Sequence, residues 1–227
     1  MNQLLAVNPS TYSGLFNLGG SLNSGNTDTR ALNVATRFQV KTHKHRFTVD
    51  AKYNYGQANG ETNARNSTGS LKYDFFTREK VYSYAQSLVE QDTLANLNLR
   101  NTDGLGFGYQ FFDSRQLSLF TEAGISYFNE DVKVGEDKSD GAGRWGIGLD
   151  WDVIPKRLKL FLRQEGYYNF GVGSVVLKTD QGFRIPLLDS IAANFEADYR
   201  FNSSPEAGKK NSDLSLILGL TYEYAYW

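Results

Sequence analysis

The sequence predicts an all-β protein, a 12-stranded antiparallel up-and-down transmembrane β-barrel, and three observations support this prediction. Apolar residues recur on one parity only in twelve segments of about ten residues, which is the pattern of strands with two different faces. The composition is typical of strands, because 22 Gly, 14 Tyr and 15 Phe accompany only 4 Pro and 1 Met. The connections alternate between short and longer, as they do in membrane barrels.

The first six segments differ in how cleanly they alternate. They cover residues 12–23, 32–40, 47–55, 68–75, 81–91 and 104–111. The third is the clearest, with polar Thr48 between Phe47 and Val49. The fifth is the weakest, because Gln86 shares the otherwise apolar face of Tyr82. Each is long enough for one strand.

The second half of the chain repeats the pattern. Its segments cover residues 117–127, 144–153, 158–168, 175–185, 191–201 and 214–226. In the last of them, Leu214, Leu216 and Leu218 share one face, while Ser215 and Gly219 lie on the other. Because twelve is an even number, the first strand starts and the last strand finishes at the same end of the barrel.

The apolar faces can point inward, as in a soluble barrel, or outward to lipid. A soluble barrel of this size has to fill a lumen wider than eight strands enclose. Ten tilted residues rise about 25 Å, which is the height of the apolar band of a membrane barrel. Aromatic residues gather near strand ends, as interface girdles do: Tyr53, Tyr55, Tyr73, Phe75, Tyr199, Phe201, Tyr224 and Tyr226. This pattern favours the membrane barrel, with the soluble barrel as the alternative.

The connections give the expected topology. We expect a short periplasmic lead at residues 1–11, followed by one barrel domain at 12–227. The periplasmic turns are expected near 41–46, 77–80, 113–116, 154–157 and 187–189. The external loops are expected near 24–28, 56–63, 92–98, 129–141, 170–174 and 203–211.

Composition and charge exclude several classes of function. A formal net charge of −1 provides no basic field for nucleic acid. The chain has no cysteine and two histidines, His43 and His45, so thiol chemistry is excluded and common zinc sites are disfavoured. The acidic segment 129–141 lacks the ligand spacing of a known calcium loop. We therefore expect no enzyme, no metal and no cofactor.

Charged residues recur on the polar face and are expected to line the lumen with balanced sign. The candidate selectivity residues are Lys52, Lys72, Asp74, Lys159, Arg163, Glu165, Lys178, Asp180, Arg184, Glu196, Asp198 and Arg200. They can form a lattice of ion pairs between neighbouring strands, such as Lys178, Arg184 or Arg200 with Glu165, Glu196 or Asp198. Alternatively, they give a narrow pore weak ion selectivity.

Glycines on the polar face predict a smooth wall of the lumen. They are Gly104, Gly106, Gly108, Gly124, Gly146 and Gly148, on three consecutive segments. One interpretation is curvature of the sheet, because glycine lets a barrel wall bend. The other is space for a solute, or for the 129–141 loop to fold inward as a constriction.

Four segments carry a family resemblance. LFNLGGSLNSGNTDTRALNV (15–34), YGQANGET (55–62), GLGFGYQFFD (104–113) and ADYRFNSSPEAGKKNSDLSLILGLTYEY (197–224) look like parts of the YdiY-like family of putative salt-induced outer-membrane proteins. The resemblance implies a Gram-negative outer membrane, with a signal peptide absent from this chain. It implies no catalytic residues.

The expected function is a narrow pore for passive passage of small solutes or ions. The alternative is a plugged, non-conducting barrel with a structural, salt- or osmotic-stress or surface-receptor role. The expected partners are outer-membrane lipids, lipopolysaccharide and small solutes or ions, without nucleic acid. The barrel assembly machinery is a further expected partner, through the final strand, which ends in aromatic Tyr226 and Trp227.

Overall fold

The computed structural model describes residues 11–23, 29–93, 97–133, 137–205 and 210–226, and these form one closed barrel of twelve strands. The strands are β1 (Thr11–Asn23), β2 (Thr29–Lys41), β3 (His45–Ala58), β4 (Glu61–Phe76), β5 (Val81–Asp92), β6 (Leu97–Asp113), β7 (Leu117–Val132), β8 (Lys138–Ile154), β9 (Leu158–Asn169), β10 (Val175–Pro186), β11 (Ile191–Asn202) and β12 (Ser212–Tyr226). Of the lead expected at 1–11, only Thr11 is described, and it begins β1.

Every strand pairs antiparallel with its neighbours in sequence, and β1 pairs with β12 to close the barrel. The predicted 12-stranded up-and-down barrel is therefore confirmed. The short connections 42–44, 77–80, 114–116, 155–157 and 187–190 lie at one end, which we call the turn end. The other end, where β1 runs into β2, is called the loop end.

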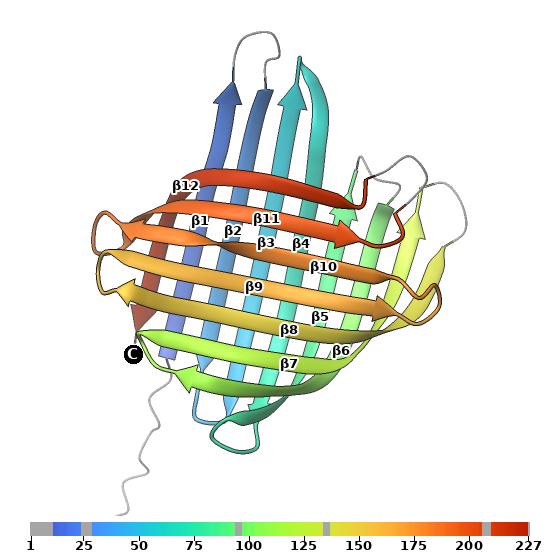
Figure 1. The fold of residues 1–227 in the computed structure, drawn as a ribbon. Coiled ribbons are helices and arrows are strands. Elements are labelled where there is room, and N and C mark those ends of the chain that lie inside the picture. The colour runs from blue at the N-terminus through green and yellow to red at the C-terminus, as the bar shows by residue number, and fades with distance from the viewer. Residues whose placement is uncertain (1–10, 24–28, 94–96, 134–136, 206–209, 227) are drawn as a thin grey trace, which may run out of the picture.

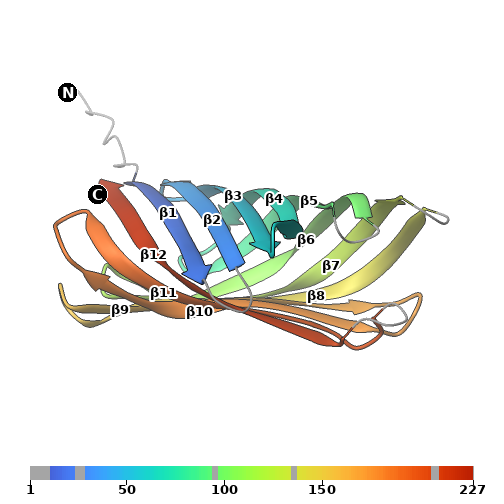
Figure 2. The same ribbon diagram turned by 90° about the horizontal axis from the view of Figure 1, so that it is seen from above.

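The barrel is flattened, and its two halves run in different directions. Figure 1 shows β1–β5 running across β8–β12, and Figure 2 shows the same two groups as two layers. Strands twist relative to their neighbours, so the two walls of a flattened barrel cross at an angle. The flattening brings side chains of opposite walls within reach of each other.

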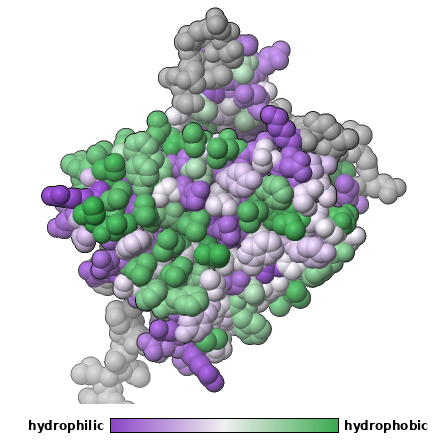
Figure 3. Space-filling view, in the orientation of Figure 1, coloured by the Kyte–Doolittle hydropathy of each residue, from purple (hydrophilic) through white to green (hydrophobic). Residues whose placement is uncertain are grey.

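The outer surface is apolar and the interior is polar. Large apolar side chains are exposed along the strands, with Phe107 71% exposed and Leu105 61% exposed, and Figure 3 shows such residues spread over one face of the barrel. Charged side chains such as Asp74 and Arg144 are buried instead. This arrangement inverts that of a soluble barrel and fits a bilayer. No helix among the described residues has the length and apolarity needed to cross a bilayer.

Two predicted loops are wrong in extent. The 56–63 loop reduces to a turn at Asn59 and Gly60, with φ of 52° and 82°. Both angles are positive, as a two-residue type I′ hairpin turn requires, and Asn-Gly is its preferred sequence. The 129–141 loop is also shorter, because β7 continues to Val132 and β8 starts at Lys138. Residues 129–132 and 138–141 therefore belong to the wall of the barrel.

The fifth strand faces the opposite way from what its apolar parity predicts in a membrane barrel. Tyr82, Tyr84 and Leu88 lie inside the barrel, and Tyr82 is completely buried. The lipid-facing parity contains Val89, which is exposed, among small residues. A tyrosine can enter a polar lumen because its hydroxyl finds a hydrogen-bond partner there.

An arginine on the outer face at mid-strand should destabilise the barrel. Leu105 lies at the middle of β6 and faces outward. We expect Leu105→Arg to lower the free energy of unfolding in lipid by about 2–4 kcal/mol, and Phe111→Arg, near the turn end, by about 0–1 kcal/mol. Urea-dependent folding into vesicles measures both. Equal costs at the two positions would contradict the lipid-facing assignment.

Candidate functional site

The candidate site is the lumen. All twelve charged residues predicted to line it take part in ion pairs. Several of these pairs join strands that are not neighbours. Their arrangement therefore decides whether the lumen is open.

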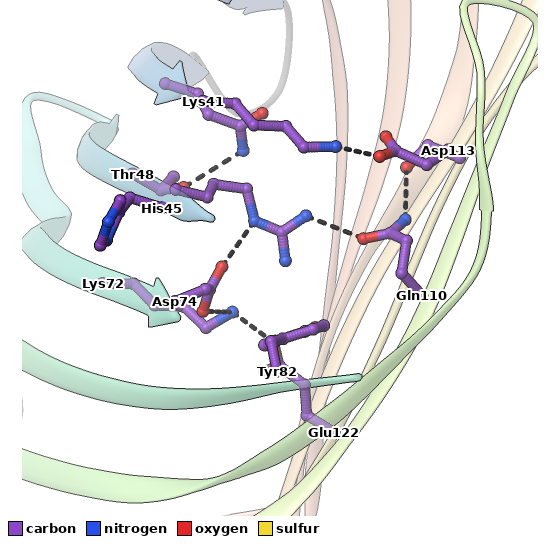
Figure 4. Close-up of polar contacts among 12 residues, drawn as sticks. Lys41, His45, Thr48, Lys72, Asp74, Tyr82, Gln110, Asp113 and Glu122 are labelled. Atoms are coloured by element: carbon purple, nitrogen blue, oxygen red, sulfur yellow. Dashed lines mark hydrogen bonds and ion pairs between the residues drawn. The ribbon is translucent and has the colours of Figure 1, made fainter. Parts of the chain in front are cut away.

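The first group, which we call the turn-side cluster, consists of Arg46, Lys72, Asp74, Tyr82, Gln110, Glu122 and Arg144. Strands β3 to β8 each contribute at least one of its residues. Arg46 donates to Asp74 at 2.5 Å and to Gln110 at 2.8 Å. Lys72 lies 2.9 Å from the second oxygen of Asp74 and also pairs with Glu122. Figure 4 shows Lys72, Asp74, Tyr82, Gln110 and Glu122 of this cluster converging from several strands.

Glu122 is the centre of the turn-side cluster. Besides Lys72, it accepts a hydrogen bond from the Tyr82 hydroxyl at 2.8 Å and one from Arg144 at 2.9 Å. Its side chain is 1% exposed. Arg144 continues to Glu165 of β9 at 2.7 Å. A buried carboxylate with three donors is well compensated, because each partner replaces a lost contact with water.

A second group spans the lumen nearer the loop end. Lys52 of β3 pairs with Asp198 and lies 3.3 Å from Glu196, both on β11. It also lies 3.8 Å from Asp180 of β10. These strands are not adjacent in the barrel, so the Lys52 side chain bridges the lumen. Lys178 of β10 makes a comparable bridge to Glu90 of β5.

The observed partners differ from the expected ones. The prediction pairs Lys178 and Arg184 with carboxylates on neighbouring strands. Lys178 instead reaches Glu90, and Arg184 reaches Glu223 of β12 at 3.2 Å. Arg200 does pair with the neighbouring strand, but with Asp180 at 3.1 Å. The flattening explains the partner of Lys178, because it brings Glu90 of the other layer within reach, whereas Glu223 lies in the same layer as Arg184, two strands away.

Three carboxylates are close enough together to suggest a cation site. Oxygen atoms of Asp180, Glu196 and Asp198 all lie within 4.8 Å of one another. The ammonium group of Lys52 already pairs with this group. We therefore treat the three residues as the counter-ions of Lys52.

Aromatic rings lie against the buried cations of the lumen. The Arg46 guanidinium lies 4.9 Å from the Tyr82 ring centre, and the Arg144 guanidinium lies 5.0 Å from that of Tyr84. Lys72 lies 5.5 Å from the ring of Phe120. Cation–π contacts of this kind stabilise buried cations that have few water contacts.

The six glycines of the expected smooth wall lie under these side chains. They are Gly104, Gly106, Gly108, Gly124, Gly146 and Gly148. A Cβ at Gly108 would collide with the Tyr82 ring, and one at Gly148 with the Phe120 ring. Gly146 lies beneath Glu122, and Gly104 beneath Ser126. The room that these glycines provide is occupied by the protein's own side chains.

Gly124 gives a test of this packing. A Cβ there would meet the Leu105 carbonyl oxygen and lie 2.5 Å from the Tyr84 hydroxyl, whereas one at Gly69 meets nothing within 4 Å. We expect Gly124→Ala to lower the free energy of unfolding by about 1–3 kcal/mol through overpacking. Gly69→Ala is the control and should be near neutral. Equal behaviour of the two variants in urea titrations would contradict the close packing.

Besides the inward-facing side chains of β5 described above, the sequence interpretation leaves out two charged residues of the lumen. Arg46 was placed in the basic turn 41–46, but β3 starts at His45 and Arg46 points inward to Asp74. The alternation was the available signal, because Arg46 has the same parity as Thr48 and Asp50. Glu90 was missed because β5 was assigned the wrong inner face.

Comparisons with known proteins identify the family of the chain and support its barrel fold. Residues 16–224 match the family model described as "Protein of unknown function, DUF481". No curated protein matches the chain. Among solved structures, a NanC porin aligns with a TM-score of 0.56 and 11% identity, over 92% of this chain and 98% of the porin. An anion-selective porin from Comamonas acidovorans aligns with a TM-score of 0.45 and 10% identity, over 95% of this chain and 99% of that one. The likeness to the NanC porin is a likeness of fold.

Proposed function

The chain belongs to the DUF481 family, and from that premise we propose that it is an outer-membrane barrel whose lumen is closed at rest by its own ion pairs. In this proposal the turn end faces the periplasm, because short turns lie on that side in outer-membrane barrels. The barrel has no catalytic role. Its role is structural, stress-related or receptor-like at the cell surface.

The bridge from Lys52 to β10 and β11 is the observation that carries this proposal. It joins opposite walls at one level, and the pair of Lys178 with Glu90 joins β10 to β5. The turn-side cluster connects the inner faces of β3 to β8 nearer the turn end, with Tyr82, Glu122 and Asp74 all buried. An ion has to displace these paired groups to pass, which costs more than crossing a water-filled pore.

A narrow pore for small solutes or ions is the second candidate. The observation in its favour is the charge-balanced polar interior, together with a cavity of about 300 Å³ near the loop end. In such a pore, the bridging side chains would swing aside to open a path. The two candidates therefore differ in conductance under ordinary salt.

The closed barrel makes a direct prediction for the unaltered protein. In planar bilayers with plain salt, we expect no current steps above the leak, because the bridges remain paired. Heat-dependent gel mobility verifies that the inserted protein is folded. Reproducible steps from the folded protein would overturn the closed barrel in favour of the narrow pore.

The proposed partners follow from the apolar outer face and the loop end of the barrel. The apolar outer face contacts outer-membrane lipids, and the loop end contacts lipopolysaccharide. The assembly machinery would recognise β12, whose last residues pair with the start of β1 at Tyr12 and Tyr226. Trp227 lies outside the described residues.

A further inference from the structure

The wall of the barrel is incomplete at the seam between its first and last strands. Pairing of β1 with β12 runs from Tyr12 and Tyr226 to Gly20 and Leu218. Beyond that point, residues 21–23 pair with β2 alone and residues 212–217 pair with β11 alone, within the described part of the chain. Figure 1 shows β1 and β12 diverging toward the loop end.

A cavity of about 300 Å³ lies directly behind this opening. Gly20 of β1 and Leu216 and Ile217 of β12 line it, so the cavity reaches both edges of the seam. Its remaining lining comes largely from β2, β3 and β4. The cavity therefore connects sideways to the surroundings of the barrel at the depth where the wall is unpaired.

Amide side chains dominate the polar lining of the cavity: Asn33, Asn54, Gln57, Asn63 and Asn66. Asn54 donates to Asn66 at 2.9 Å, while its own Oδ1 has no hydrogen-bond partner among the described residues. The charged residues of the lining are Arg30 and Asp198, and Asp198 is paired with Lys52. Amides both donate and accept, so this lining suits an uncharged group with several hydroxyls.

The edge of the opening is apolar on its outer side. Leu214, Leu216 and Leu218 face outward on β12, and Leu216 is 76% exposed. A hydrocarbon chain lying along these leucines would remain in the lipid phase. The polar lining of the cavity and the apolar outer edge of the opening together fit an amphiphile whose head group lies inside the wall and whose hydrocarbon chain lies outside it.

We propose that this cavity binds the uncharged, hydroxyl-rich head group of a membrane amphiphile, whose acyl chain leaves through the β1–β12 seam into the bilayer. The inference rests on the proposed membrane location and not on closure of the lumen. It makes the loop end of the barrel a lipid-head-group site that is reached from the side.

Single-cysteine variants test the site, because the chain has no cysteine of its own. Ser215→Cys places a bimane label on the cavity lining. Ser70→Cys is the matched control, since β4 is paired on both sides at that residue. Leu105→Cys, on the outer face of β6 away from the cavity, reports lipid contact. The probe is dodecyl glucoside with a nitroxide on its chain, added to the folded protein in vesicles.

We expect a saturable loss of fluorescence for Ser215→Cys that unlabelled dodecyl glucoside reverses and glucose does not. Ser70→Cys should show no saturable loss, and adding Asn54→Leu to Ser215→Cys should raise the half-saturating probe concentration. Reversal by glucose alone would make this a site for soluble sugars and overturn the proposal. A loss that vanishes as protein density rises would place a second copy on the free edge of β12, which also overturns it.

The variant that reports lipid contact separates the test of the membrane location from the test of the head-group site. No quenching of Leu105→Cys would overturn the membrane location itself. Quenching of Leu105→Cys without a saturable loss for Ser215→Cys would overturn the head-group site alone.

Discussion

Replacing Glu122 by alanine should lower the free energy of unfolding by about 3–5 kcal/mol, because it leaves buried cations without their carboxylate. Lys72 and Arg144 both pair with Glu122, and their side chains are 14% and 3% exposed. Tyr82 would lose its acceptor at the same time. Little water is available to compensate at this depth.

The measurement is a urea titration of folding into vesicles, followed by tryptophan fluorescence. Glu130→Ala is the control, because Glu130 pairs with Arg100 at 2.7 Å near the loop end and is more exposed. We expect the control to cost about 0–1 kcal/mol, as partly exposed pairs do. If Glu122→Ala costs no more than Glu130→Ala, the turn-side cluster does not hold the walls together.

The barrel was predictable from sequence because the outer face of its wall is apolar and the inner face is polar. In β6, apolar Leu105, Phe107 and Tyr109 alternate with Gly106 and Gly108, and this period of two holds through the middle of the strand, up to the register shift after Gln110. Short turns between such segments fix an up-and-down order without any long-range information. The polar residues on either side of Asn59 and Gly60 continue β3 and β4 and do not form a loop. The Asn-Gly sequence is therefore a better guide to the position of this turn than the polarity of the segment around it.

The inner face of β5 could not be assigned by hydrophobicity. Tyr82 and Tyr84 are as compatible with a lipid interface as with a polar lumen, because each has an apolar ring and a hydroxyl. What decides their place is the pair of glycines opposite, since Gly106 and Gly108 leave room for the two rings. That complementarity depends on register, which single-strand patterns do not contain.

Parity indicates which charged side chains share a face, but it does not indicate which of them pair. Parity alone brings Lys52, Lys178 and Asp198 to the inner face. Whether Lys52 meets a neighbour or the opposite wall depends on the cross-section of the barrel. A round barrel of twelve strands would keep the walls apart, whereas the flattened one lets Lys52 reach Asp198.

The bridges across the lumen lead to a prediction about conductance. We expect the double variant Lys52→Met, Lys178→Met to conduct ions in planar bilayers, with cation selectivity. Both bridges lose their cation, while Asp180, Glu196 and Asp198 keep their negative charges at the same level. An excess of carboxylates in a narrow lumen favours cations over anions.

Arg37→Met combined with Arg163→Met is the matched control, because it also removes two positive charges from the lumen. Arg37 pairs with Asp50 and Arg163 with Asp150, in each case on an adjacent strand. Loss of two such pairs changes the lumen charge equally but leaves both bridges in place. The control should therefore remain silent. Equal currents from both variants would show that lumen charge, and not the bridging of opposite walls, determines whether ions pass.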